Sequence, residues 1–362
     1  MLLISFGSSC KKKDKTISEN AADGGFDRKA MLTNYGSKVI VPAYTAFNLA
    51  CVRLDSTITD FNLSPDAARL LNLQTVFKNT YRVWQSASSF GFGPADDLYL
   101  SKNMNTFPCD TNKINSYVNS GTYNLDAIAN SDAKGLPAMD YLLFGMSKEN
   151  TSLLVRYTTD NAAAKRKAYL AALSASMKTN ASAVLNGWNN YMTTFLNASG
   201  TDVGSSLGQL INELDEDLEI LKNYKIGLPL GKQSMGSPFP GKVEAYYCGI
   251  SSELAVLHLK SVQSIYVGKG LAEGNLLGLD DNLGAIDAKY NNGSLNVAIA
   301  NQFTAAINKM QAVPDPLSNS IINNQALVNA AYVEIQKLVV LLKTDMPSSL
   351  GILITYEDND GD

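Results

Sequence analysis

The sequence predicts an all-α protein of two helical bundles, built from long antiparallel helices that meet near residue 200. Apolar residues mostly recur at spacings of three and four, which is typical of amphipathic helices. Alternating β-branched patterns, which would indicate strands, are nearly absent. Asn-Ala-Ser-Gly at residues 197–200 interrupts the longest helical pattern, so we expect one bundle over residues 27–200 and another over 201–362.

The first bundle opens with a helical pattern over residues 36–62. Ser-Pro-Asp at residues 64–66 then predicts a helix start, with Ser as N-cap, Pro in the first position and an acid in the first turn. A loop rich in Gly, Phe and Pro follows at residues 90–94. The longest helix is expected over residues 160–198.

The second bundle begins after that break, and a long Gly/Pro-rich loop over residues 226–240 interrupts it. Loops of this length without structure of their own tend to be functional or mobile. The periodicity predicts helices over residues 203–223, 242–267, 281–290, 295–311 and 317–343.

The first residues are typical of an exported bacterial lipoprotein. A short apolar run ends in Gly-Ser-Ser before Cys10, and lysines follow directly. Residues 1–10 are therefore interpreted as a signal remnant ending at a lipidated Cys10, and the polar residues 11–26 as a flexible tether. A buried apolar strand with an ordinary cysteine is the alternative. No other stretch approaches ~18 uninterrupted apolar residues, the length of a membrane-spanning helix.

Composition excludes some classes of partner and site. The net charge is −4 with no basic patch, which argues against nucleic acid as a partner. The three remaining cysteines, Cys51, Cys109 and Cys248, are far apart and lack zinc-site spacing. They are predicted to be small buried residues, and a disulfide between two of them in an oxidising envelope is the alternative.

Four segments, in this order, resemble one known family. They are Pro-Ala-Tyr at residues 42–44, Trp84 upstream of Phe-Gly-Pro-Ala at 92–95, Gly-Leu-Pro-Ala-Met-Asp-Tyr-Leu-Leu-Phe-Gly at 135–145, and the closing segment 350–362. Together they resemble the imelysin-like family, also called the M75 peptidase group, over essentially the whole mature chain. The resemblance implies two helical domains with a site between them, and an association with iron uptake in the cell envelope. A founding member was described as a metal-dependent peptidase.

The segment over residues 135–145 departs from the family pattern Gly-x-His-x-x-Glu. On a helix, that His and Glu would share one face and suit a metal. Here Pro137 stands at the His position, where it has no lone pair to give, and Asp140 replaces Glu with a shorter carboxylate. Gly135 in a turn and Pro137 in a first helical turn also fit plain architecture. Catalysis by a metallopeptidase is therefore not expected.

Glu244 resembles a second family segment, in which an acid begins a helix that reaches the site between the domains. If Asp140 and Glu244 converge, they form a weak candidate metal site or acid–base pair in which one carboxylate has a raised pKa. An acid favourably placed in a first helical turn is the alternative. Candidate residues of the cleft between the domains are Gly135, Pro137, Asp140, Glu244, Tyr44, Trp84 and Tyr246.

Other candidate groups are interpreted structurally. His258 is the one histidine of the chain and lies among leucines, so a packed side chain is expected instead of a ligand. The acidic run between Glu213 and Glu219 is interpreted as a solvated helix face. The terminal residues 358–362 resemble half of a calcium loop and lack its closing Glu.

Three functions follow from these observations. The first is a non-catalytic, lipid-anchored envelope protein that binds a small ligand, haem or a metal in iron or metal uptake. The second is an M75-type metallopeptidase with altered ligands, and the third is a structural accessory of an outer-membrane transport complex.

Overall fold

A computed structural model describes residues 25–271 and 274–356 of the chain. The predicted lipidation site Cys10, most of the predicted tether and the acidic segment 358–362 lie outside these residues. The prediction of an all-α fold is confirmed, because the described residues form helices joined by loops and one two-residue strand pair.

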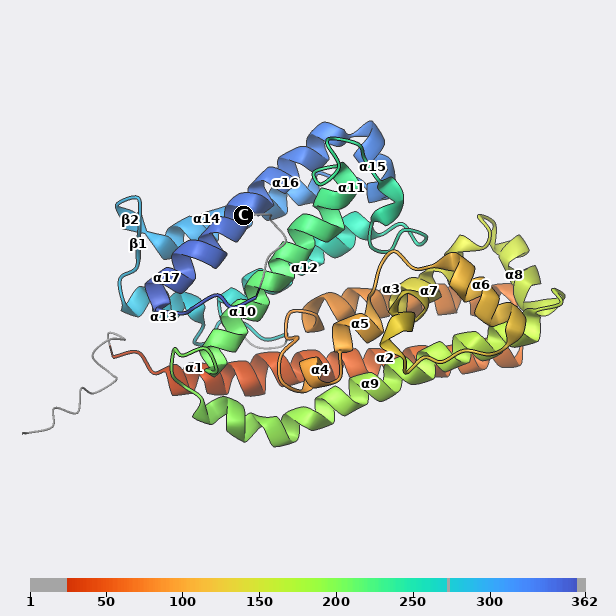
Figure 1. Cartoon of the computed structure of the whole chain (residues 1–362), viewed down its shortest axis with the longest axis horizontal. Helices are drawn as coiled ribbons and strands as arrows, with labels where there is room; N and C mark the ends of the chain where they lie inside the picture. Colours follow the sequence, from red (N-terminus) through yellow and green to blue (C-terminus); the bar gives the residue numbers. More distant parts are fainter. Residues whose placement is uncertain (1–24, 272–273, 357–362) are drawn as a thin grey trace, which may run out of the picture.

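The helices fall into two groups along the chain, and Figure 1 shows the long helices of the first group side by side. The first group contains α1 (Arg28–Asn34), α2 (Val41–Leu63), α3 (Ala67–Ala87), α4 (Pro94–Asp97), α5 (Leu100–Met104), α6 (Thr111–Ser120), α7 (Gly135–Asp140), α8 (Asn150–Thr158) and α9 (Ala163–Asn197).

Helix α2 is the centre of the first group, where it packs against both α3 and α9. A π-helical stretch, Tyr35–Ile40, joins α1 to α2, so helical structure runs unbroken from Arg28 to Leu63. The wide turns end directly before Pro42, whose ring lacks an N–H donor and crowds the preceding turn of a regular helix. Apolar residues of α2 such as Phe47 and Ile58 are fully buried.

The second group follows the break after α9. It contains α10 (Ser206–Glu219), α11 (Leu228–Leu230), α12 (Ser251–Tyr266), α13 (Leu279–Ala285), α14 (Leu295–Gln311), α15 (Leu317–Asn323), α16 (Gln325–Val340) and α17 (Met346–Leu350), with β1 (Lys289–Tyr290) and β2 (Gly293–Ser294) forming an antiparallel pair.

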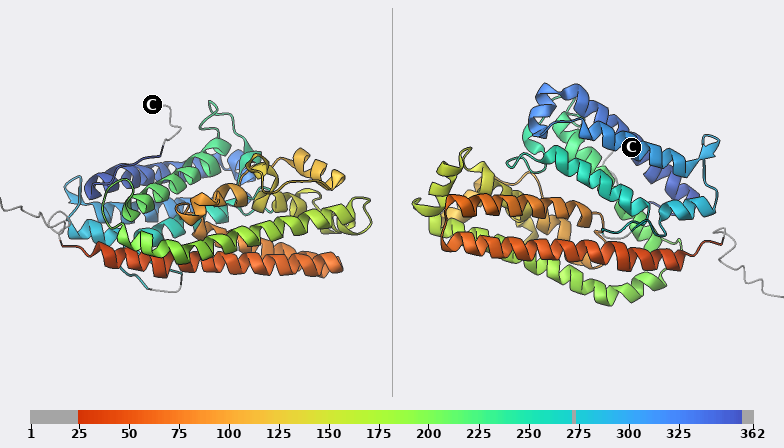
Figure 2. Two further views of the ribbon diagram at one scale, coloured as in Figure 1. Left: turned by 60° about the horizontal axis from the view of Figure 1, so that its bottom comes forward. Right: turned by 180° about the vertical axis from the view of Figure 1, so that it is seen from behind.

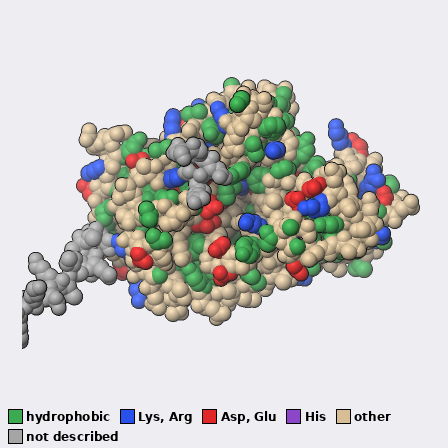
Figure 3. Space-filling model, viewed as in Figure 1, with side chains coloured by type: hydrophobic (Ala, Val, Ile, Leu, Met, Phe, Trp, Pro, Cys, Tyr) green, Lys and Arg blue, Asp and Glu red, His purple; other side chains and the backbone are tan. Residues whose placement is uncertain are grey.

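Helix α12 connects the two groups. It packs against α14 of its own group and against α3 of the first group, and Figure 2 shows it from behind in this intermediate position. One contiguous set of buried apolar side chains runs through both groups. The surface in Figure 3 is hollowed where the groups meet. The division at residue 200 into separate domains therefore stays a prediction.

One helical run in the described part of the chain, Gln325–Leu350, is long and apolar enough to cross a membrane by length and composition alone. Its most apolar window is 39% buried inside the protein, and its α16 portion packs against α14. Core helices of this kind pass the same test.

Several predicted boundaries need correction. Asp66 caps α3 in place of Ser64, because its carboxylate accepts the Arg69 N–H. The predicted helix 242–267 begins only at Ser251, and turns occupy the residues before it. The predicted helix 317–343 is broken at Asn324. All three cysteines are free; the prediction of small buried residues is confirmed for Cys51 and Cys248 and is wrong for Cys109, which is half-buried.

Candidate functional site between the two groups of helices

A small cavity lies where the segment 135–140 of the first group meets the segment 241–247 of the second. Its volume is about 270 Å³. Half of its lining residues are aromatic or proline, and one is a carboxylate; the walls include Phe107, Pro108, Pro137, Asp140, Tyr246 and Tyr247. Two of the segments that resemble the imelysin-like family are thus adjacent in space.

Gly135 and Pro137 shape the start of α7. Gly135 has a φ of +69°, and a Cβ at this position would overlap the carbonyl oxygen of Met104. Only glycine adopts this turn without strain at so close an approach. Pro137 lies in the first turn of α7, where a helix does not need its missing N–H, and it faces the cavity.

Asp140, at the end of α7, fastens the second group to the first. Its two carboxylate oxygens accept the backbone N–H groups of Tyr247 and Cys248, each at 2.8 Å. Burial raises the pKa of Asp140 to about 6, and these donors together with nearby Lys78 oppose the rise. The carboxylate therefore changes its charge close to neutral pH while it holds a chain turn in place.

Glu244 lies two residues before the Tyr246 wall of the cavity, but its carboxylate has different partners. It accepts hydrogen bonds from Gln85 (3.1 Å) and Asn105 (2.7 Å) and pairs with Lys225 at 3.0 Å. The hypothesis of a shared carboxylate pair is not supported, because each acid has its own donors. The pKa of Asp140 is raised as that hypothesis expects, but the cause is burial of the carboxyl and not the charge of Glu244. Glu244 is in a turn, so the placement in a first helical turn is wrong.

A buried network of charged side chains extends from Glu244 into the second group. The Lys225 ammonium donates to Gln85 (2.8 Å) and lies 3.0 Å from Nδ1 of His258, whose Nε2 lies 2.7 Å from Asp217. The two ring nitrogens of His258 therefore face an ammonium on one side and a carboxylate on the other. His258 is thus a packed side chain that joins two charged groups, as its leucine-rich surroundings predicted.

Asp217 is the last residue of this network. Its carboxylate also accepts a hydrogen bond from the hydroxyl of Ser89, in the loop after α3. Burial alone would raise the pKa of Asp217. The contacts with His258, Lys225 and Ser89 outweigh burial and hold the pKa below its usual value. The network therefore connects the two groups through charges that stay paired.

The interpretation of the acidic run as a solvated face is wrong. Asp215, Asp217 and Glu219 are buried, and within the run only Glu216 is exposed. Lys343 balances Glu219 at 2.8 Å. Burial and the neighbouring carboxylates raise the pKa of Glu213 to about 8. A repeated acid–leucine pattern looks alike in both environments, because the compensating cations come from distant segments.

Of the three aromatic candidate residues, one lines the small cavity and two belong to the buried core of the first group. Tyr246 is 41% exposed and lines the cavity. Tyr44 is buried with its hydroxyl donating to the Phe90 carbonyl, and Trp84 packs against Phe47 at 5.0 Å between ring centroids. Tyr44 and Trp84 thus stabilise the first group, at a distance from the wall.

Comparison with known proteins identifies the family to which this chain is related. The model of the imelysin family, peptidase M75, matches residues 40–344. The chain belongs to the imelysin family. It is 20% identical over 312 residues to Iron-regulated protein A of Synechococcus elongatus, covering 81% of this chain and 79% of that protein.

Two solved structures share the imelysin fold with this chain. One is provisionally named an iron-regulated protein A precursor, from Parabacteroides distasonis, with a TM-score of 0.73, 17% identity and coverage of 89% of this chain and 95% of that one. The other is an imelysin-like protein from Psychrobacter arcticum, with a TM-score of 0.71, 17% identity and coverage of 92% and 98%. Likeness at this identity shows the fold.

The imelysin motif in this chain does not fit a catalytic zinc ion. Zinc catalysis typically takes about three protein ligands. Pro137 offers none, which leaves Asp140 as the one residue of the motif with a ligand atom. Among residues 25–271 and 274–356, no group of three His, Cys, Asp or Glu side chains is placed to hold a metal ion.

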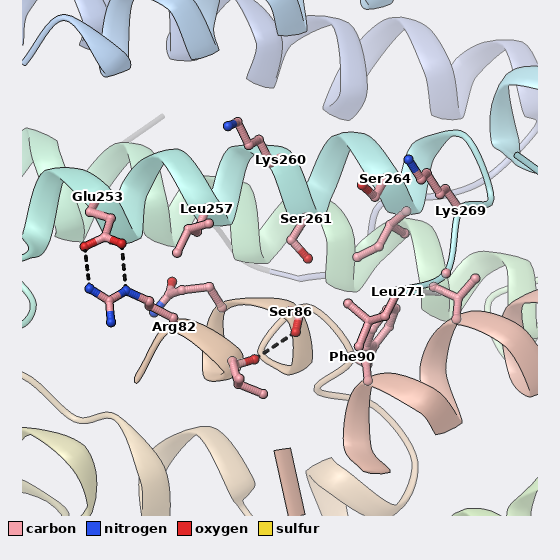
Figure 4. A pocket seen from close by; sticks show the side chains of 16 residues that line it. Arg82, Ser86, Phe90, Glu253, Leu257, Lys260, Ser261, Ser264, Lys269 and Leu271 are labelled. Carbon is pink, nitrogen blue, oxygen red and sulfur yellow. Dashed lines mark hydrogen bonds and ion pairs between the residues drawn. The ribbon is translucent and has the colours of Figure 1, made fainter. Parts of the chain in front are cut away.

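A second, larger cavity of about 450 Å³ lies between α12 and the pair α2 and α3 (Figure 4). Sequence reasoning missed it, because its walls come from α2 and α3 on one side and, on the other, from α12, which lies far along the chain. The one available signal was the regular placement of Leu257, Ser261 and Ser264 on one side of α12. Such spacing has the same appearance in an ordinary packed helix.

Proposed function

We propose that this imelysin-family protein is a lipid-anchored, non-catalytic component of the bacterial cell envelope that binds a small ligand during iron or other metal uptake. The iron association is supported by the names of its relatives in Synechococcus and Parabacteroides. The anchor is supported by the pattern around Cys10, and the word precursor in the Parabacteroides name is consistent with export.

The observation that carries the proposal is that Pro137 and Asp140, at the two motif positions, both line the small cavity. This wall has kept one carboxylate and has lost the motif histidine. A cavity with one charge and several aromatic rings suits recognition of a ligand more than activation of water. Binding without hydrolysis follows from this donor set.

The same walls narrow the choice of ligand. Tyr247 lies in the wall with its phenol pKa raised by burial, so it offers a neutral hydroxyl. Asp140 is then the charge available in the wall, and a cation bound there keeps most of its own water or chelating ligands. Histidine ligation of haem is disfavoured, because His258 is the only histidine and both its ring nitrogens are engaged in the core.

Calorimetric titration tests the binding function. Protein purified without chelator is titrated with ferric citrate, Fe²⁺, Zn²⁺ and hemin, and peptide hydrolysis is measured in parallel. We expect one of the iron or metal probes to bind, Asp140→Ala to weaken that binding at least tenfold, and Asp97→Ala, an exposed acid of α4, to leave it unchanged.

The other two functions give different results in the same experiment. Stoichiometric zinc together with hydrolysis that Asp140→Ala abolishes would establish the peptidase. If no probe binds and an outer-membrane protein co-purifies, the accessory role replaces ligand binding.

The anchor is tested separately in cells. Mass spectrometry of the membrane fraction is expected to find acyl chains on Cys10, and Cys10→Ser is expected to release the protein from the membrane. If the Cys10→Ser variant stays in the membrane fraction as the wild type does, or if Cys10 carries no acyl chain, the anchor is contradicted. Neither result affects the binding test.

A further inference from the structure

We propose that the larger cavity along α12 is a second binding site, which takes an amphipathic organic anion. It is the space of about 450 Å³ between α12 and α2–α3, and its volume is in the range of cavities that hold one drug-sized molecule. The site differs from the small cavity beside Asp140 and shares none of its lining residues.

The walls of the larger cavity are chiefly apolar. They are contributed by both groups of helices and include Val39, Ala43, Val83, Phe90, Leu257 and Ile265. Such a surface binds the hydrocarbon part of a ligand, because removing apolar area from water stabilises the complex. The ligand therefore has an apolar body.

The charged side chains of the cavity select an anion. Arg82, Lys260 and Lys269 line it together with one acid, Glu253, so the lining carries three positive charges and one negative, a net +2 in a chain of net −4. The Arg82 guanidinium donates two hydrogen bonds, of 2.7 and 3.0 Å, to the Glu253 carboxylate. The two lysines of the lining, both exposed, are left as the excess charge.

The two ends of the cavity differ, as Figure 4 shows. The Arg82–Glu253 pair bounds one end, and Phe90 lies with Leu271 and Lys269 at the other. At that second end Gly270 packs so closely on the Lys38 carbonyl of the first group that a Cβ would overlap it. An elongated ligand therefore lies along α12, with hydroxyl donors from Ser261 and Ser264 beside it.

A ligand in this position contacts both groups of helices and adds a link beside the buried network. Gln85 separates the two: it lines the cavity, and its amide bonds to Glu244 and Lys225 on the other side. Binding is thus expected to raise the melting temperature of the whole protein.

The experiment compares two probes of equal chain length and opposite charge, decanoate and decyltrimethylammonium, by calorimetry below their micelle concentrations. We expect decanoate to bind one to one and at least tenfold more tightly than the cation. The double variant Lys260→Glu/Lys269→Glu is expected to weaken decanoate at least tenfold. The matched double variant Lys29→Glu/Lys309→Glu, which changes exposed lysines outside the cavity, keeps the affinity within twofold.

Two further variants locate the site. Ser261→Trp fills the cavity and is expected to abolish decanoate binding, whereas Asp97→Ala, at an exposed residue outside the cavity, leaves it intact. Because Lys260 and Lys269 are exposed, their double variant is expected to fold as the wild type does, which circular dichroism verifies. Equal affinity for both probes, no decanoate binding, or full binding by the Lys260/Lys269 variant would overturn the proposal.

Discussion

Asp140 and Glu244 are two buried acids from two of the segments that resemble the imelysin family, and their surroundings differ. Asp140 accepts two main-chain N–H groups and borders a cavity. Glu244 is bound by side chains, one of which is the Lys225 ammonium. Main-chain donors carry no compensating charge, so burial raises the pKa of Asp140, whereas Glu244 belongs to a network of paired charges.

The comparison indicates that Asp140 is the candidate for function at this interface and that Glu244 contributes to stability. A carboxylate beside a cavity with a pKa of about 6 is able to respond to a cation or to pH. A carboxylate paired with Lys225 and hydrogen-bonded by Gln85 and Asn105 connects the two groups of helices to each other. The predictions below test that division.

The largest effect is expected from removing the cation of the network. Lys225→Met leaves Glu244 buried without its counter-charge, and breaking a buried pair in this way costs about 3–5 kcal/mol in the free energy of unfolding. Lys337→Met, which removes a surface pair with Glu334 at 2.8 Å, is the control and costs about 0–1 kcal/mol. Urea denaturation measures both, and similar values would mean that the network does not hold the groups together.

A smaller effect is expected at Asp140, and it depends on pH. Its pKa rises from 3.8 to about 6 on folding, so between these values the unfolded state loses the proton first. Stability therefore falls as the pH rises from about 4 to about 6, by about 2–3 kcal/mol. Asp140→Asn is expected to remove this fall. A variant whose curve of stability against pH parallels the wild type would contradict the assignment.

The smallest effect is expected at Asp217, with the opposite sign. Its pKa is lower in the folded state than its usual 3.8, so the stability it provides is complete above about pH 4 and is lost as the pH falls through the folded value. Asp217→Asn is expected to cost about 1–2 kcal/mol at pH 7 and to reduce the loss below pH 4. Asp97→Asn, an exposed acid, serves as the control. If the unfolding free energy of Asp217→Asn falls below pH 4 as steeply as that of the wild type, the pairing with His258 is contradicted.

The sequence predicted elements well where the signal is local. The helix predicted over residues 295–311 has those bounds in the structure, and the one predicted over 160–198 is α9, Ala163–Asn197. It failed over residues 242–250, where an apolar, helix-like composition forms turns instead. Those turns place Tyr247 and Cys248 N–H groups on Asp140, a contact between residues more than 100 positions apart.

By itself, the sequence determined the all-α class, the family resemblance and the loss of the motif histidine at Pro137, because periodicity and residue identity are local properties. Only the tertiary structure decided which acids are buried, which partner each one has, and that a cavity with excess lysine charge lies along α12. These outcomes depend on donors and cations from distant segments. The environment of a charge is set by what packs around it, and the spacing of residues along one helix does not contain that information.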